Sequence, residues 1–125
     1  DFCLSRGLGD VYKRQDITGI PAREEMRLIE QNFGVWEGTS PRNSHEFYEA
    51  KKGFVQRFGS GESMFQLAQR IYNLLDELKA DSDKTYILVA HNGIARIVSS
   101  YFKDMTNDEF AAYGVANCSI TEFEF

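Results

Sequence analysis

The sequence predicts a fold of the α/β class, and three observations in its second half carry that prediction. Residues 86–91 begin with an apolar run that has the β-branched composition of a strand covered on both faces. The run leads through Asn92 and Gly93 into apolar residues that recur at helical spacing. Residues 63–79 carry another apolar stripe at helical spacing. A buried strand between two amphipathic helices is typical of an open α/β sheet.

Length and composition limit the protein to one folded domain. The chain has 125 residues, and its content of 42% hydrophobic and 14% aromatic residues argues against disorder. The net charge is −5 and basic residues form no cluster, so neither nucleic acid nor an anionic membrane surface is expected as a partner. No bilayer-spanning stretch or secretory leader is seen, and the expected location is the cytoplasm. Cys3 and Cys118 lack metal-ligand spacing and suit a reducing compartment, although a pair alone leaves a disulfide open. Cys118 is expected to be buried.

The first fifteen residues need an explanation of their own. They show no sustained periodicity, and residues 10–15 resemble one reading frame of a transposon end that is used to tag DNA for sequencing. We therefore expect residues 1–15 to be a non-native, adaptor-derived segment. Genuine sequence would then begin near Asp16, inside a reading frame whose upstream part is absent.

The segment before the helical second half is expected to be mostly loop. Residues 25–30 predict a short extended segment with Met26 and Leu28 pointing inward. The glycines and aromatic residues of 33–38 predict a tight loop with two aromatic side chains packed beneath it. Residues 39–60 are interpreted as a small insertion over the sheet.

Caps and glycines predict where the remaining elements begin and end. Helices are expected over about 44–52, over 63–79 and over 106–114, and the last two begin with capping boxes. The buried stripe of the second helix is expected to consist of Met64, Leu67, Ile71, Leu74, Leu75 and Leu78. Residues 120–125 alternate between apolar and acidic side chains and predict a half-exposed edge strand.

His91 lies where the predicted strand turns into a helix, a position at which α/β sheets bind ligands. The N-terminus of the following helix offers unpaired N–H groups and the positive end of the helix dipole to an anion. A hydrogen-bonded structural role for His91 stays open on this segment alone. Glu30, taken by itself, is typical of an ordinary loop carboxylate.

Three motifs occur in one order along the chain: L-I-E-x-x-F-G-V-W-E-G over 28–38, G-E-S over 61–63 and I-L-V-A-H-N-G over 87–93. Together they resemble the phosphoglycerate-mutase-like branch of the histidine phosphatase superfamily, and the closing N-C-S-I of 117–120 extends the resemblance over most of 16–125. The resemblance implies a three-layer α/β/α fold with a mostly parallel sheet. Residues 16–125 would be the C-terminal part of a single such domain, incomplete at its N-terminus.

The resemblance also implies phosphoryl transfer through a covalent phosphohistidine, with a phosphomonoester hydrolase as the expected activity. His91 would donate hydrogen bonds to the phosphoryl oxygens, and Glu30 would protonate the leaving alcohol and then activate water. The backbone N–H of Asn92 would also contact the phosphate. The mechanism needs neither a metal nor a cofactor, and the expected partner is a small phosphorylated substrate.

The family's nucleophilic histidine, which follows the first strand in an Arg-His-Gly motif, is absent from this sequence. Arg6-Gly7 imitates that motif without a histidine, and we reject it as a nucleophile site. His45 is expected to be a solvent-facing helix residue, and Arg70 is expected on the solvated face of its helix. Trp36, Glu37 and Glu62 are expected to fix the geometry of the loop and the helix rather than to contact the substrate.

Two other functions stay open at this point. A phosphoglycerate-type mutase would use the same residues in a more closed site. A noncatalytic member would bind a phosphorylated ligand or a partner protein. The short insertion favours the hydrolase, because it leaves the site open to water. The 125-residue chain itself is expected to be inactive and marginally stable without the family's first strand, and the sequence specifies no oligomeric state.

Overall fold

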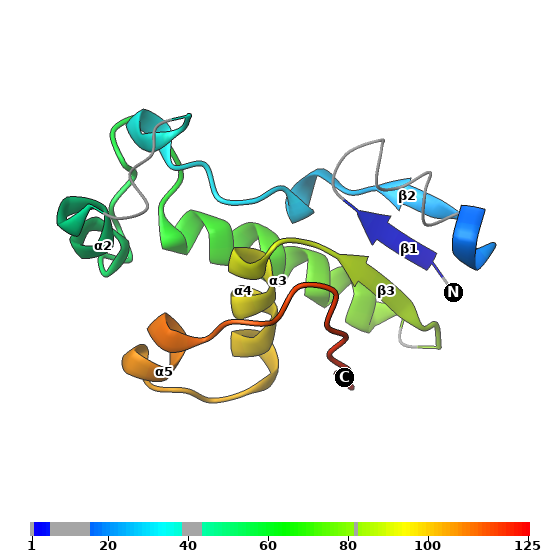
Figure 1. Ribbon diagram of the computed structural model, residues 1–125. Helices are drawn as coiled ribbons and strands as arrows, with labels where there is room; N and C mark the ends of the chain where they lie inside the picture. The colour runs from blue at the N-terminus through cyan, green and yellow to red at the C-terminus, as the bar shows by residue number, and fades with distance from the viewer. Residues whose placement is uncertain (1, 6–15, 39–43, 82) are drawn as a thin grey trace.

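The computed structural model describes residues 2–5, 16–38, 44–81 and 83–125 (Figure 1). Arg6-Gly7 and residues 10–15 therefore lie outside the described residues, as do 39–43. In chain order the elements are β1 (Phe2–Ser5), β2 (Ala22–Glu24), the 3-10 helices η1 (Met26–Leu28) and η2 (Gly34–Trp36), α2 (His45–Lys51), α3 (Met64–Ala80), β3 (Tyr86–Val89), α4 (Asn92–Phe102) and α5 (Asn107–Ala112).

The sheet has three described strands in the order β2-β1-β3, and both pairings are parallel. Cys3 of β1 stands opposite Ala22 on one side and Ile87 on the other. The predicted α/β class with a parallel sheet is confirmed. The central strand lies within residues 1–15, whose non-native origin stays a prediction.

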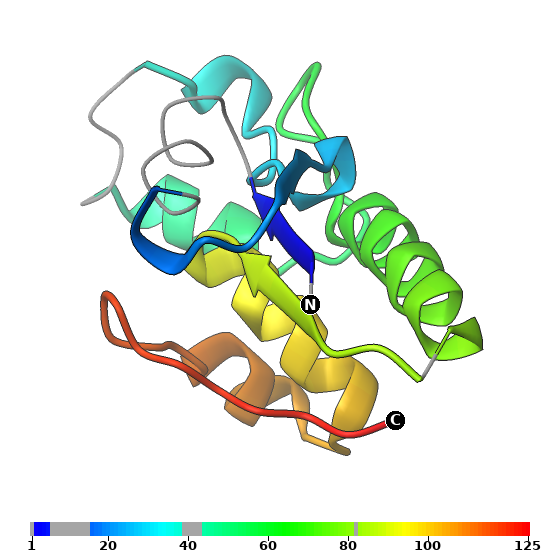
Figure 2. The same cartoon turned by 90° about the vertical axis from the view of Figure 1, so that its right-hand side faces the viewer.

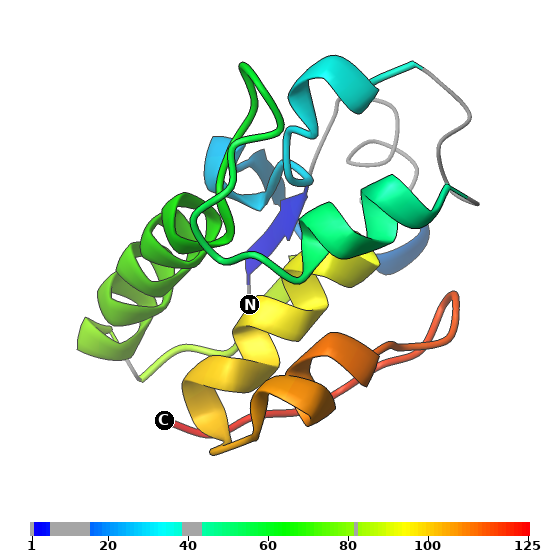
Figure 3. The ribbon, with the colours of Figure 1, turned by 90° about the vertical axis from the view of Figure 1, so that its left-hand side faces the viewer.

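Helices α3 and α4 contact each other and form one layer on the sheet. Figure 2 views the molecule with β3 in front of α4, and the opposite view in Figure 3 has α4 in front of β3. Every residue of the predicted α3 stripe is buried, and both predicted capping boxes, at Ser63 and at Thr106, are formed. The helical predictions are therefore confirmed. They can be made from the sequence because a cap and a helical repeat depend only on residues a few positions apart.

The prediction that residues 87–89 are covered on both faces is wrong for the described part of the chain. Ile87 is exposed, whereas Leu88 packs against the core formed with α3 and α4. Neighbouring residues of a strand point to opposite faces, and the two long helices lie on one face. The face that carries Ile87 therefore lacks a covering helix among the described residues.

Residues 25–30 do not form the predicted extended segment. The carboxylate of Glu25 accepts a hydrogen bond from the backbone N–H of Arg27 at 3.0 Å and caps η1. The tight turn separates the two side chains that an extended segment would place on one face. Leu28 is fully buried as predicted, but Met26 is 63% exposed, so its inward placement is wrong.

The predicted edge strand over 120–125 is absent: the described residues there form no strand. Instead the tail packs its aromatic rings on the end of α4, with the ring of Phe123 stacked 4.7 Å from that of Phe102. Phe125 lies 5.2 Å from the same ring. Alternation alone predicted the strand, but a strand also needs a neighbour with which to pair. Cys118 is likewise exposed and not buried, with a free thiol and a backbone φ of 62°.

Aromatic packing joins α2 to the loop that contains η2. Phe47 of α2 is buried, and its ring lies 5.4 Å from Phe33 and 5.8 Å from Trp36. The prediction that two aromatic residues pack beneath the loop is therefore confirmed. Ser44 caps the helix, and His45 is exposed at its first position, as expected.

Glu25 also forms an ion pair that makes stability depend on pH. Its Oε1 accepts from Nε of Arg27 at 2.8 Å, and this hydrogen bond lowers the pKa of Glu25 below its ordinary value of 4.5, with burial acting in the opposite direction. Because the pKa is lower in the folded state, the stabilisation is complete above the unfolded value and is lost as the pH falls through the folded value.

Glu25→Gln is expected to lower the free energy of unfolding by about 1 kcal/mol at neutral pH and by nearly nothing near pH 2. Urea unfolding at both pH values measures the difference. Glu24→Gln, an exposed neighbour, is the matched control and should change neither value. Equal destabilisation by Glu25→Gln at both pH values would show that the carboxylate charge contributes nothing.

Candidate active site

The candidate site lies at the start of α4, directly after β3 (Figure 1). His91 is the N-cap residue: its backbone is extended, and its carbonyl accepts from the N–H of Ala95 at 3.1 Å. The His91 side chain is exposed and makes no capping hydrogen bond. It therefore stands at the helix mouth, as predicted, and is accessible from solvent.

The structure brings Glu30 to the same helix end, 63 residues away in sequence. Its Oε2 accepts from the backbone N–H of Gly93 at 3.3 Å, and its Oε1 accepts from the N–H of Gln31 at 2.9 Å. A Cβ atom on Gly93 would collide with Oε1 and lie 3.1 Å from Cδ. The missing side chain at Gly93 thus lets the carboxylate approach the helix backbone.

Asn92, the third predicted residue, is the first residue of α4. Its backbone N–H belongs to the first helical turn, whose N–H groups have no acceptor within the helix. Its side chain turns elsewhere, because Oδ1 accepts from the N–H of Val115 at 3.0 Å. That bond fixes the chain after α5 beside the helix start.

Arg96 is a charged neighbour of the site that the sequence reasoning missed. It donates through Nε and Nη2 to the carbonyl of Tyr113 at 3.3 and 3.0 Å, and it lies 5.6 Å above the ring of Phe110. Burial lowers the pKa of Arg96, and the negative charge of Glu30 opposes that shift. Its position one turn after Asn92 on the predicted helix is the signal that could have found it.

The prediction for Arg70 is wrong, because its side chain is only 22% exposed and faces the loop that carries Glu30. Its Nε and Nη2 bind the two carboxylate oxygens of Glu62 at 2.7 and 2.9 Å. It also donates to the carbonyl of Ile29 at 2.6 Å and to that of Arg27. Helical spacing places Arg70 off the apolar stripe, but residues 27–30 cover that side of α3.

Two loops around the site are joined backbone to backbone. The N–H of Val35 donates to the carbonyl of Phe58 at 3.0 Å, and that of Glu62 donates to Asn32 at 2.8 Å. Glu37 closes the first loop, because its Oε1 accepts from the N–H of Phe33 at 2.7 Å. The contacts of Glu37 and Glu62 agree with the geometric roles expected of them.

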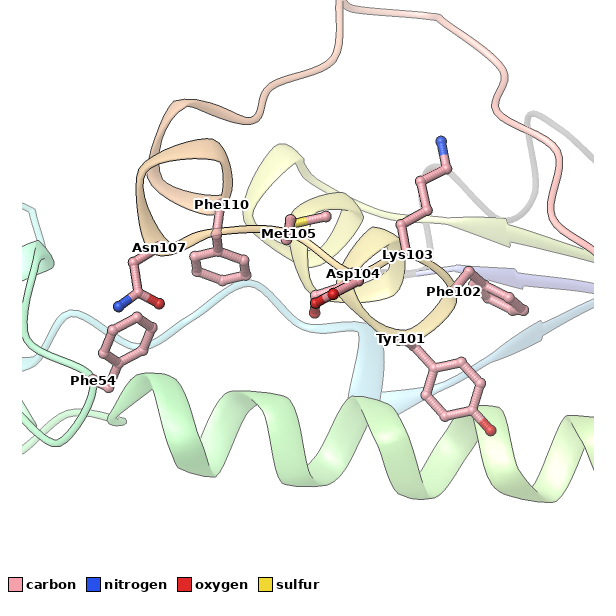
Figure 4. Close-up of a pocket in the computed structure, with 9 residues that line it drawn as sticks. Phe54, Tyr101, Phe102, Lys103, Asp104, Met105, Asn107 and Phe110 are labelled. Carbon is pink, nitrogen blue, oxygen red and sulfur yellow. The ribbon is translucent and has the colours of Figure 1, made fainter.

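A pocket of about 320 Å³ lies at the other end of α4 (Figure 4). Two neighbouring rings, Phe54 and Phe110, border one side of it with centroids 6.1 Å apart. None of its lining residues is a predicted site residue. We therefore place the candidate site at the exposed start of α4 rather than in this pocket.

Within the described ranges, no cluster of three metal-ligating side chains of the His, Cys, Asp or Glu type occurs. The helices in those ranges are too short or too polar for any of them to cross a membrane.

Many solved structures share the fold, and three of them are compared with the chain. The native structure of a mycobacterial glucosyl-3-phosphoglycerate phosphatase matches with a TM-score of 0.72 and 24% identity, over 90% of this chain and 62% of that one. The alpha-ribazole phosphatase from Shigella flexneri matches with a TM-score of 0.66 and 20% identity, over 93% and 63%. Bacillus stearothermophilus YhfR matches with a TM-score of 0.65 and 21% identity, over 90% and 63%. The chain thus spans less than two thirds of each of these proteins.

No curated protein matches the sequence. The family model described as histidine phosphatase superfamily (branch 1) does match, over residues 12–125. That span contains β2, β3, both long helices and all three predicted site residues. The shared fold confirms the predicted phosphoglycerate-mutase-like architecture. The chain belongs to branch 1 of the histidine phosphatase superfamily.

Proposed function

We propose that the protein to which this chain belongs hydrolyses phosphomonoesters through a phosphohistidine intermediate, with Glu30 and His91 in its active site. The observation that carries the proposal is the position of the Glu30 carboxylate, 3.3 Å from the N–H of Gly93 at the helix start that His91 caps. At one helix N-terminus, a hydrogen-bond donor can bind the phosphoryl oxygens while an acid protonates the leaving oxygen of the ester.

In this mechanism the phosphoryl group lies at the start of α4. His91 and the backbone N–H of Asn92 donate to its oxygens, and they stabilise charge that spreads over them in the transition state. Glu30 gives its proton to the leaving alcohol. It then takes a proton from the water that cleaves the phosphohistidine bond.

The nucleophilic imidazole must come from another histidine. His45 is exposed on α2 and takes no part, and His91 already serves as a donor. We place the nucleophile in native sequence upstream of Asp16, with residues 1–15 as an adaptor-derived replacement. The 125-residue chain is then inactive.

Two comparisons favour a small phosphorylated substrate. A solved structure of the mycobacterial glucosyl-3-phosphoglycerate phosphatase is a complex with inorganic phosphate, and it matches this chain with a TM-score of 0.70. Two of the similar proteins are named as phosphatases and none of the three as a mutase. We accordingly favour hydrolysis over mutase activity. The location that we propose is the cytoplasm, as the sequence leads us to expect.

The test uses the native protein, with the upstream residues of its source gene, and p-nitrophenyl phosphate as a general substrate. Glu30→Gln is expected to lower kcat by about 10²–10⁴-fold, because general acid catalysis contributes that much. Glu124→Gln in the C-terminal tail, exposed and far from the start of α4 in the sequence, is the matched control and should retain full activity. The 125-residue chain should show no turnover.

Three results would overturn the proposal. Full activity of Glu30→Gln would remove Glu30 from the mechanism. Binding of inorganic phosphate by the native protein, without turnover of any phosphomonoester, would instead support the noncatalytic binding module. Transfer between positions of a three-carbon phosphoglycerate, without release of phosphate, would support the mutase.

A further inference from the structure

We propose that Arg70 is the positioning residue of the site: held by Glu62, it fixes the backbone of residues 27–30 so that the Glu30 carboxylate meets the start of α4. The catalytic meaning of this inference rests on the proposed function. Its structural content does not, because it concerns one hydrogen bond between Glu30 and Gly93.

The anchor of the arrangement is α3. Arg70 lies in the second turn of this helix, between Leu67 and Ile71, which are fully buried. Buried neighbours on both sides fix the position of the Arg70 backbone. The guanidinium therefore starts from a rigid element and not from a loop.

Glu62 orients the guanidinium. Its two oxygens accept from Nε and Nη2 of Arg70 at 2.7 and 2.9 Å, a bidentate geometry that fixes the plane of the group. The remaining donors then point at the loop, where Nη2 binds the carbonyl of Ile29 at 2.6 Å and Nη1 binds that of Arg27. These two contacts flank Leu28, whose buried side chain fixes the middle of the segment.

A second contact from Glu62 holds the other side of Glu30. The buried Gln31 donates through Nε2 to the Glu62 carbonyl at 2.9 Å, and the N–H of Glu62 donates to Asn32 at 2.8 Å. Glu30 thus lies between two bound points, the Ile29 carbonyl and the Gln31 side chain. Its carboxylate is aimed by the backbone on both sides.

Arginine suits this role better than lysine. Its planar fork donates in several directions at once, whereas an ammonium group is a point charge on a flexible stem. The guanidinium of Arg27 is not available for the task, because it binds Glu25 at 2.8 Å and Glu77 at 2.7 Å. A displacement of about 1 Å in a positioning contact is enough to cost about 100-fold in rate.

The experiment follows the backbone amide of Gly93 by ¹⁵N–¹H NMR during a pH titration of the 125-residue chain. An N–H that donates to a carboxylate shifts as that carboxylate gains a proton. His91 and Arg96 also lie near this amide and can affect its chemical shift. The titration is therefore repeated with the Glu30→Gln variant. The part of the Gly93 shift that is absent in this variant reports the hydrogen bond between Gly93 and Glu30.

Arg70→Met should reduce that Glu30-dependent part of the Gly93 shift at least about twofold, because a hydrogen bond weakens steeply once its distance and angle change. Glu62→Gln, which keeps the size of the side chain, should give a smaller reduction, and Arg70→Lys should restore part of the signal. The matched control is Arg57→Met, which removes an exposed arginine and should leave the Gly93 titration unchanged.

An undiminished Gly93 titration in a folded Arg70→Met variant would overturn the inference. If Arg70→Met does not fold, the comparison passes to Glu62→Gln and Arg57→Met, and equal titrations in those two variants would overturn it as well. Neither readout needs turnover, so a failed phosphatase assay leaves this test valid. In the native enzyme the same substitution should lower kcat with little change in KM.

Discussion

Gly61→Ala is expected to lower the free energy of unfolding by about 3 kcal/mol or more, because the new methyl group has no space. A Cβ atom at this position would collide with the carbonyl of Asn32 and lie 2.6 Å from the N–H nitrogen of Gly34. It would also lie 2.8 Å from the carbonyl of Arg57. All three are backbone atoms, which cannot rotate away as the end of a side chain can. Urea unfolding followed by circular dichroism measures the change.

The substitution should also separate the two loops beside the site. One of the two bonds that join them runs from the N–H of Glu62 to Asn32, one residue after the enlarged position. Gly38→Ala is the matched control: its backbone φ is 69°, but no atom lies within 4 Å of the added Cβ. It should cost only about 1 kcal/mol for the left-handed backbone. Equal losses in both variants would show that the close approach at Gly61 carries no energy.

Ile71→Ala is the second change with a large expected effect, a loss of about 2–5 kcal/mol in the free energy of unfolding. Ile71 is 0% exposed and belongs to the core that joins α3 and α4 to Leu28. Removing its outer carbons loses the transfer free energy and leaves a cavity between two helices that cannot fully collapse.

Ile120→Ala makes the same chemical change at a position that is 96% exposed. It should alter the free energy of unfolding by no more than about 0.5 kcal/mol. Unfolding of both variants in urea gives the comparison directly. A loss below 1 kcal/mol for Ile71→Ala would mean that α3 does not pack as the structure has it.

The elements predicted well from the sequence are those whose causes lie close together in the chain. The stripe of α3 needs only a periodicity of 3.6 residues, and its start needs only Ser63 and Gln66, three positions apart. His91 at the mouth of α4 follows from the same local reasoning. For Glu30, local reasoning favoured an ordinary loop residue, and only the surrounding motif indicated a site.

The failures have long-range causes. The prediction places Arg70 in solvent because helical spacing carries no information about distant parts of the chain. Residues 27–30, forty or more positions away in sequence, cover its side chain. The inward placement of Met26 is wrong because the sequence pattern does not reveal the turn that Glu25 caps. The prediction of a strand over 120–125 is wrong for a related reason. An alternating sequence does not show whether a neighbouring strand is present to pair with it.

The bond between Glu30 and Gly93 has a consequence for how the molecule folds. Taken alone, it closes a loop of 63 residues. Once Arg70 holds the carbonyl of Ile29, the open path to Gly93 is only the 23 positions that follow Arg70. For a flexible chain the shorter path lowers the closure entropy by about 1 kcal/mol. A contact that is weak by itself thus closes a shorter loop whenever Arg70 already holds Ile29.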